Sequence, residues 1–136
     1  MNAEVNWIDG MRFDASSDSK HPVSMDSAPG SASAPSPMEY VLMSLCGCTA
    51  MDVISIVQKM RRTVNRFSVK AQGNRAETHP KKFIGVNIAY EITSPDLTDE
   101  ELRRAVELSQ EKYCSVSAMF TGSGATLTWS ASISRA

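Results

Sequence analysis

Residues 36–60 read SPMEYVLMSLCGCTAMDVISIVQKM, and this long apolar stretch decides the fold of the chain. Ser36 is suited to cap a helix and Pro37 to occupy its first turn, so we predict a central helix over residues 37–62. At about 1.5 Å per residue such a helix is roughly 35 Å long, which is as wide as a domain of this size. Because the stretch is apolar on most sides, we expect the helix to run through the centre of the fold or along an interface.

The composition is that of an ordinary soluble domain. The chain has 136 residues, of which 42% are hydrophobic and 21% charged, and its net charge is −1. Charges of both signs are interspersed, which does not favour a nucleic-acid or membrane partner. Glu39, Asp52 and Lys59 interrupt the apolar stretch, so we expect a core or interface helix rather than a membrane span. The N-terminus has no secretory pattern and the three cysteines are an odd number, so we predict a cytoplasmic protein.

Runs typical of strands lie on both sides of the predicted helix. EVNWI and MRFDA flank Asp9–Gly10, a dipeptide typical of two-residue hairpin turns, and a PVSM run could form a third strand. FSVKAQ, FIGVNIAYEIT and ATLTWSASIS follow the helix. The second and third of these runs alternate between apolar and small or polar residues, which predicts strands with one buried face. The expected buried positions of the second are Ile84, Val86, Ile88, Tyr90 and Ile92.

A second helix is predicted over residues 98–114. Thr98 and Glu101 match a capping box, and the charged, amphipathic pattern ends near Cys114. Strands segregated from helices in this order indicate an α+β fold. We therefore predict one domain over residues 1–136, with N-terminal strands and a Ser/Pro-rich loop in 1–36, the central helix, and the remaining strands and the second helix in 63–136.

The three cysteines occupy different settings. Cys46 and Cys48 point about 200° apart around the helix axis, so they can neither bond each other nor chelate one metal ion. Cys46 shares an apolar face with Leu42 and Val53, which favours a protonated packing residue. Cys48 shares a small, polar seam with Ser44, Asp52 and Ser55, and is therefore the functional candidate.

Cys114 is the possible partner of Cys48. At a helix C-terminus the negative end of the dipole raises the pKa of a thiol, which makes Cys114 a poor first nucleophile. If the two cooperate, we expect Cys48 to attack and Cys114 to resolve. From the residues alone, two ordinary buried cysteines remain an equally good interpretation.

At these segments the chain resembles the osmotically inducible protein C / organic hydroperoxide resistance (OsmC/Ohr) superfamily. The resemblance covers nearly the whole length, and it is closest to the small bacterial branch through SPMEYVLMSLCGC and ELSQEKYCSVSAM. It implies an OsmC-like α+β fold in an intertwined homodimer. Two long helices, one from each subunit, pack back to back, antiparallel sheets wrap around them, and two sites lie at the subunit interface.

The resemblance also implies an activity, the thiol-dependent reduction of small organic hydroperoxides. The position of Cys48 is that of the peroxidatic cysteine, which becomes a sulfenic acid. The position of Cys114 is that of the resolving cysteine, which closes a disulfide that an external dithiol reduces. No metal or organic cofactor is implied.

One feature departs from the family pattern. Active members place a glutamate directly after the helix-opening proline, where it holds an arginine beside the peroxidatic thiol. Here that position is Met38, the carboxylate moves to Glu39, and Arg12 is a candidate for the arginine. The alternative function is therefore a non-catalytic or redox-sensing OsmC-like protein that binds an apolar ligand at the dimer interface.

Overall fold

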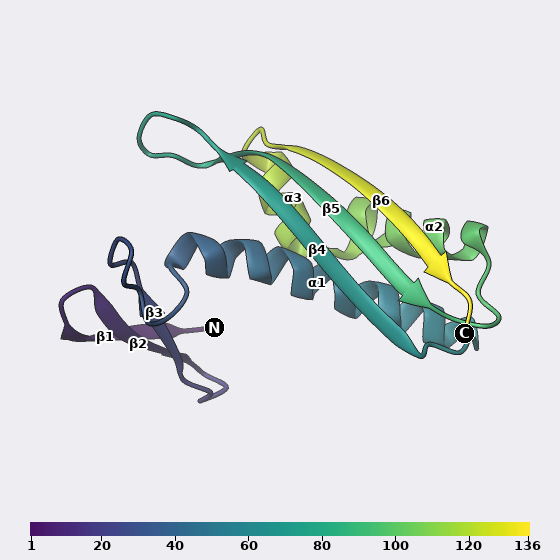
Figure 1. The fold of residues 1–136 in the computed structure, drawn as a ribbon, viewed down its shortest axis with the longest axis horizontal. Helices are drawn as coiled ribbons and strands as arrows, with labels where there is room; N and C mark the ends of the chain where they lie inside the picture. Colours follow the sequence, from purple (N-terminus) through teal and green to yellow (C-terminus); the bar gives the residue numbers. More distant parts are fainter. The chain divides into compact units, whose positions relative to one another are not determined.

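In the computed structural model, which describes all 136 residues, three strands precede a long helix, and strands and shorter helices follow it (Figure 1). The chain divides into two units, Met1–Val41 and Leu42–Ala136. The organisation of residues 1–136 as one domain stays a prediction.

The first unit is built on an antiparallel sheet in the order β1-β2-β3. Its strands are β1 (Ala3–Asp9), β2 (Arg12–Ser17) and β3 (Val23–Asp26). The predicted hairpin is confirmed, and Gly10 adopts φ +47° in its turn, a conformation that glycine reaches without steric cost. The predicted third strand is also confirmed.

The long helix, α1 (Pro37–Lys59), begins as predicted, with the Ser36 side chain accepting a hydrogen bond from the Glu39 N–H at 3.3 Å. It ends within the predicted range in a reverse turn at Arg61, whose φ is +60°. There the Arg62 N–H donates to the Val57 carbonyl at 3.3 Å, which closes the last turn. Its fully buried stripe is Leu45, Thr49, Val53 and Val57, spaced one helical turn apart.

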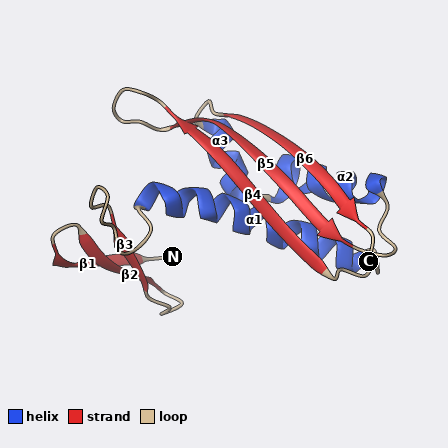
Figure 2. Ribbon diagram, viewed as in Figure 1, coloured by secondary structure: helices blue, strands red, loops and turns tan.

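The second unit holds a sheet in the order β4-β5-β6, with helices behind it in the view of Figure 2. The strands are β4 (Arg66–Arg75), β5 (Phe83–Thr93) and β6 (Thr126–Ser134). β4 and β5 are antiparallel, but β6 runs parallel to β5, which corrects the prediction that the sheets are antiparallel throughout. The reason is the long helical crossover between β5 and β6, which parallel neighbours require.

That crossover also corrects the prediction of a single helix over 98–114. Its first part, α2 (Asp99–Leu108), has the predicted capping box between Thr98 and Glu101. A π-helical turn, η1 (Ser109–Tyr113), follows, and an additional helix, α3 (Ser115–Gly122), begins directly after it. Helix α3 was not predicted, because a short segment rich in serine with a cysteine as its N-cap has none of the usual start signals.

The core of the second unit lies between the sheet and its helices, and it contains most of the predicted strand positions. Ile84 is the exception, since it is 50% exposed while Phe83 is buried. The β4–β5 register shifts here, from Asn74 opposite Gly85 to Arg75 opposite Phe83, so Ile84 is the extra residue of a bulge and turns outward. The buried apolar side chains of the sheet are Phe83, Val86, Ile88, Tyr90 and Ile92.

Candidate functional site around Cys48 and Cys114

The two thiols that the sequence singled out lie together in the second unit. Cys48 projects from the middle of α1, and Cys114 lies at the junction between η1 and α3. The two side chains are close enough to hydrogen-bond, and each alters the pKa of the other. The Cys48 Sγ atom also lies 3.8 Å from the Ser115 Oγ atom. Tertiary packing therefore brings α1 to the first turn of α3, with both sulfurs at the contact.

The N-terminus of α3 stabilises the Cys48 thiolate. Burial acts to raise the pKa of this thiol, but hydrogen bonds from the Val116 N–H, the Cys114 thiol and the Ser115 hydroxyl outweigh it. The pKa of Cys48 therefore lies below its ordinary value, although the nearby carboxylate of Asp52 opposes the shift. Backbone N–H groups and the positive end of a helix dipole lower the pKa of cysteines in this way.

Cys114 is the less acidic of the pair. It is only 4% exposed, and burial is the main reason that its pKa is raised, with the neighbouring Cys48 adding to the effect. Its Sγ atom caps α3 by accepting a hydrogen bond from the Ser117 N–H at 3.3 Å. The predicted direction of the shift and the predicted position at a helix end are right, but burial is the main cause of the shift. Cys114 lies both at the end of η1 and at the start of α3, and desolvation is the largest contribution to its raised pKa.

Cys46 lies apart from this contact, half-buried in α1. Burial raises its pKa. A protonated thiol is a poor nucleophile, which suits the packing role that the sequence indicated for Cys46.

A buried network of polar side chains joins α1, β5 and η1 beside the two thiols. The Thr49 hydroxyl lies 2.6 Å from the Tyr90 hydroxyl and 2.7 Å from the Ser109 hydroxyl. Ser109 donates to Asp52 at 2.9 Å, and the Gln110 amide donates to Tyr90 at 2.7 Å. The sequence predicts that Asp52 lies on the same face as Cys48 and that Tyr90 is buried, but it does not predict the network that joins them. The one signal in the sequence is Ser109, which continues the stripe of Leu102, Ala105 and Val106 on the second helix.

The hydroxyl groups of this network can donate their hydrogen bonds in only one order. A hydroxyl has one proton to donate. Because Ser109 donates to the Asp52 carboxylate, Thr49 must donate to Ser109, and Tyr90 must donate to Thr49. The chain of donors therefore ends on the carboxylate one helical turn after Cys48, and it holds that carboxylate in place.

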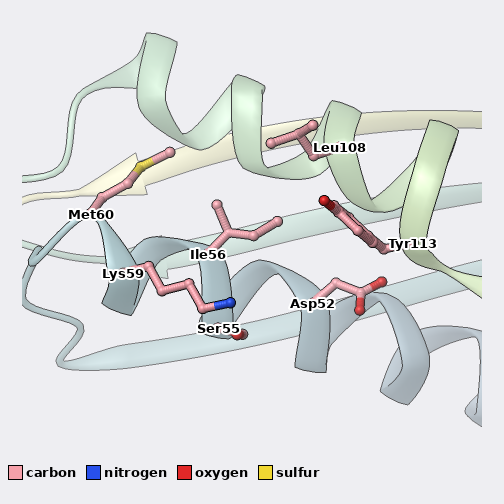
Figure 3. Close-up of a pocket in the computed structure, with 7 residues that line it drawn as sticks. All are labelled: Asp52, Ser55, Ile56, Lys59, Met60, Leu108 and Tyr113. Atoms are coloured by element: carbon pink, nitrogen blue, oxygen red, sulfur yellow. The ribbon is translucent and has the colours of Figure 1, made fainter.

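A cavity of about 450 Å³ opens between α1 and the α2–η1 segment (Figure 3). In Figure 3 the side chains of Ile56, Met60 and Leu108 project into it from both sides, while Asp52 and Tyr113 lie at one end. Asp52 also acts on Cys48, so this end of the cavity is next to the thiols. The lining residues are Asp52, Ser55, Ile56, Lys59, Met60, Leu108 and Tyr113.

Arg12, the candidate arginine, and Glu39, the displaced carboxylate, both belong to the first unit. In the first unit, Arg12 forms an ion pair with Asp9 at 3.6 Å, and Glu39 is exposed near the start of α1. The groups that favour the Cys48 thiolate are amide, thiol and hydroxyl donors, and the charged group that acts on it is Asp52. No three His, Cys, Asp or Glu side chains lie together in a way that could hold a metal ion.

The comparisons with known proteins agree with this architecture. The OsmC-like protein family matches residues 30–130. Protein YhfA of Escherichia coli K12 is 46% identical over 119 residues, which is 88% of each chain.

Two solved structures share the fold. An OsmC-like protein from Mycoplasma pneumoniae has a TM-score of 0.85 at 17% identity and covers 97% of this chain and 95% of its own. A Legionella pneumophila protein described as an organic hydroperoxide resistance protein OsmC has a TM-score of 0.68 at 15% identity and covers 96% and 95%. This chain belongs to the OsmC-like protein family, within the OsmC/Ohr superfamily.

Proposed function

We propose that this protein is a thiol-dependent peroxidase that reduces organic hydroperoxides, with Cys48 as the peroxidatic and Cys114 as the resolving cysteine. One observation carries the proposal: two thiols from distant parts of the chain are in contact, and the more accessible one has the lowered pKa. The name of the Legionella pneumophila relative, an organic hydroperoxide resistance protein, supports the same chemistry at the level of the family.

The proposed reaction has three balanced steps. The Cys48 thiolate attacks the distal peroxide oxygen, an S–O bond forms as the O–O bond breaks, and the leaving alkoxide takes a proton to become an alcohol. The Cys114 thiolate then attacks the Cys48 sulfur, an S–S bond forms, and hydroxide leaves and becomes water. An external dithiol reduces the disulfide by thiol–disulfide exchange. No step calls on a metal or an organic cofactor.

The cavity next to Asp52 is the proposed site for the organic group of the substrate. Ile56, Met60 and Leu108 offer it apolar contacts, and its volume of about 450 Å³ is that of a site for a small molecule. Met60 suits alkyl groups of different shape, because the methionine side chain is flexible and polarizable.

We also propose that the protein works as a homodimer in the cytoplasm. Helix α1 is long and apolar enough to cross a membrane by length and composition alone, yet the family match includes it in the OsmC-like fold. Val41, Met43 and Met51 on this helix are 40%, 47% and 72% exposed. An exposed apolar helix of this length is suited to a second copy of the chain. A reducing compartment supplies the dithiol.

The matched cysteine variants test the peroxidase. Purified protein is mixed with tert-butyl hydroperoxide and dithiothreitol, and hydroperoxide consumption is followed. We expect Cys48→Ser to abolish turnover and Cys46→Ser to leave it unchanged. Without dithiothreitol, Cys114→Ser should stop at a sulfenic acid that dimedone traps on Cys48. Undiminished turnover by Cys48→Ser would contradict the proposal.

A second candidate is a non-catalytic or redox-sensing protein that binds an apolar ligand. It is favoured by the charge beside Cys48, since the Asp52 carboxylate disfavours the thiolate. Alkylation with iodoacetamide at pH 6 separates the two functions. Rapid labelling of Cys48 supports catalysis, and slow labelling together with tight binding of an apolar dye supports the binding protein.

A further inference from the structure

The first turn of α3 presents two serine hydroxyls to two different thiols. The segment runs Cys114, Ser115, Val116, Ser117. The Ser115 Oγ atom lies 3.8 Å from the Cys48 Sγ atom, and Ser115 is exposed to solvent. Ser117 is only 1% exposed, and its N–H donates to the Cys114 Sγ atom at 3.3 Å. Each serine is therefore associated with one cysteine of the pair.

The Ser117 hydroxyl has no hydrogen-bond partner, although it is buried. A buried hydroxyl without a partner destabilises a fold, so its presence requires an explanation. The hydroxyl does influence Cys114, because it is one of the groups that favour the ionised form of this thiol. A thiolate is a stronger hydrogen-bond acceptor than a thiol. Ser117 is thus placed to gain a full partner when Cys114 loses its proton.

We propose that the two serines are catalytic residues that serve separate steps, with Ser115 assisting the attack of Cys48 on the hydroperoxide and Ser117 assisting the attack of Cys114 on the Cys48 sulfenic acid. This inference rests on the proposed peroxidase function.

In the first step Ser115 acts on the reacting sulfur and on the leaving group. Its hydroxyl donates a hydrogen bond to the Cys48 thiolate before the attack. As the O–O bond breaks, negative charge moves from the sulfur to the alkoxide oxygen, and the same hydroxyl gives its proton to that oxygen. Ser115 is exposed to solvent, so water restores the proton. Oxidation of Cys48 and reduction of the peroxide balance without a further reactant.

In the second step Ser117 acts on a sulfur that water reaches poorly. Cys114 is 4% exposed and must ionise before it can attack. The Ser117 hydroxyl and N–H together offer two donors to the Cys114 thiolate. The proton that Cys114 loses joins the hydroxide that leaves the Cys48 sulfenic acid, so that water is released and Ser117 keeps its own proton. Closure of the disulfide should therefore depend on Ser117, whereas formation of the sulfenic acid should not.

Single-turnover kinetics of Ser115→Ala and Ser117→Ala test the inference. Dimedone trapping reports formation of the sulfenic acid by tert-butyl hydroperoxide, and non-reducing mass spectrometry reports closure of the disulfide. Hydrogen bonds to charged groups correspond to about tenfold or more in rate. We expect Ser115→Ala to slow the first step about tenfold and leave the second unchanged, and Ser117→Ala to do the reverse. Ser115→Thr, which keeps the hydroxyl, should retain the first rate.

Two controls separate catalysis from folding. Thr121→Ala removes a hydroxyl from the same helix, one that donates to the carbonyl groups of Ser117 and Ala118, and it should leave both steps unchanged. Ser117→Ala removes an unpartnered buried hydroxyl, so its melting temperature should equal or exceed that of the wild type. A slower disulfide step in a protein of undiminished stability cannot come from a structural defect.

The outcomes distinguish this inference from the function on which it rests. If Cys48→Ser still consumes the hydroperoxide, the peroxidase itself is wrong. If Cys48→Ser is inactive but the two alanine variants match the wild type in both steps, only the assignment of each serine to one step is wrong. Slowing of the same step by both variants would likewise overturn it.

Discussion

On two faces of α1, the pKa of the same kind of side chain is shifted in opposite directions. Cys46 and Cys48 are both half-buried and belong to the same apolar helix. Burial raises the pKa of Cys46, whereas the hydrogen-bond donors at the start of α3 lower the pKa of Cys48 in spite of burial. The comparison shows that burial alone does not determine the pKa of these thiols. The hydrogen-bond donors that packing places beside each sulfur do.

The largest expected difference is between the rates at which Cys48 and Cys46 are alkylated. In the wild type at pH 7, iodoacetamide should label Cys48 at least about 100-fold faster than Cys46, because the thiolate is the nucleophile. Peptide mass spectrometry after timed quenching measures both rates in one sample. Cys46→Ser should keep the fast reaction and Cys48→Ser should lose it. Similar rates at the two sites would remove the distinction between the two faces.

The next largest effect is expected from a substitution in the buried stripe of α1, which lies between the face of Cys46 and the face of Cys48. Thr49→Val removes the centre of the network and leaves the hydroxyls of Tyr90 and Ser109 short of a partner. We expect a loss of about 2–3 kcal/mol in the free energy of unfolding, because unsatisfied buried groups are costly. Urea unfolding measures it. An unchanged free energy of unfolding would mean that the network does not depend on Thr49.

A smaller effect should come from the charge beside Cys48. Asp52→Asn removes the carboxylate that opposes thiolate formation but keeps an oxygen that accepts from Ser109. The pKa of Cys48 should fall further, so the pH profile of its alkylation should move to lower pH, with a rate increase of about threefold at pH 6. Cys46 should not change. An unchanged profile for Cys48 would mean that Asp52 is screened from it.

The smallest effect is predicted at an ion pair remote from both thiols. Arg62, just after α1, pairs with Glu101 in α2 at 2.7 Å, and hydrogen bonds from Arg62 are the main reason that the pKa of Glu101 falls to about 2. A carboxyl whose pKa is depressed on folding stabilises the fold above its ordinary value of 4.5. This contribution is lost as the pH falls towards 2.

Glu101→Gln should therefore unfold slightly more easily than the wild type at pH 7, and the difference should shrink below pH 4. Urea midpoints at several pH values measure it. Labelling rates of Cys46 and Cys48 should be unaffected at pH 7. A change in either rate would show that the environments of the thiols depend on the ion pair between Arg62 and Glu101. The hydrogen-bond donors beside each sulfur would then not be sufficient to explain them.

Local patterns were enough to predict much of the fold. The Ser36 and Pro37 signals located the start of α1, and the Thr98–Glu101 capping box located that of α2. The alternation of apolar residues with small or polar residues located β5 and β6. It failed at Ile84, because a bulge depends on the partner strand, and it could not tell that β6 runs parallel to β5.

The candidate site was predicted only in part. The helical repeat assigned Cys46 and Cys48 to different faces of α1, because this repeat depends only on residues within one segment. The network through Tyr90, Ser109 and Gln110 escaped prediction because its members come from different elements.

By itself, the sequence determined the long helix, its two differently oriented cysteines and most of the strands, because each depends on neighbours a few residues away. Tertiary structure alone decided that Cys48 meets the first turn of α3 and that Asp52 is held by a chain of buried donors. The pKa of a thiol depends on the donors and charges within a few ångströms of the sulfur. At Cys48 these include donors far along the chain, brought to the sulfur by folding.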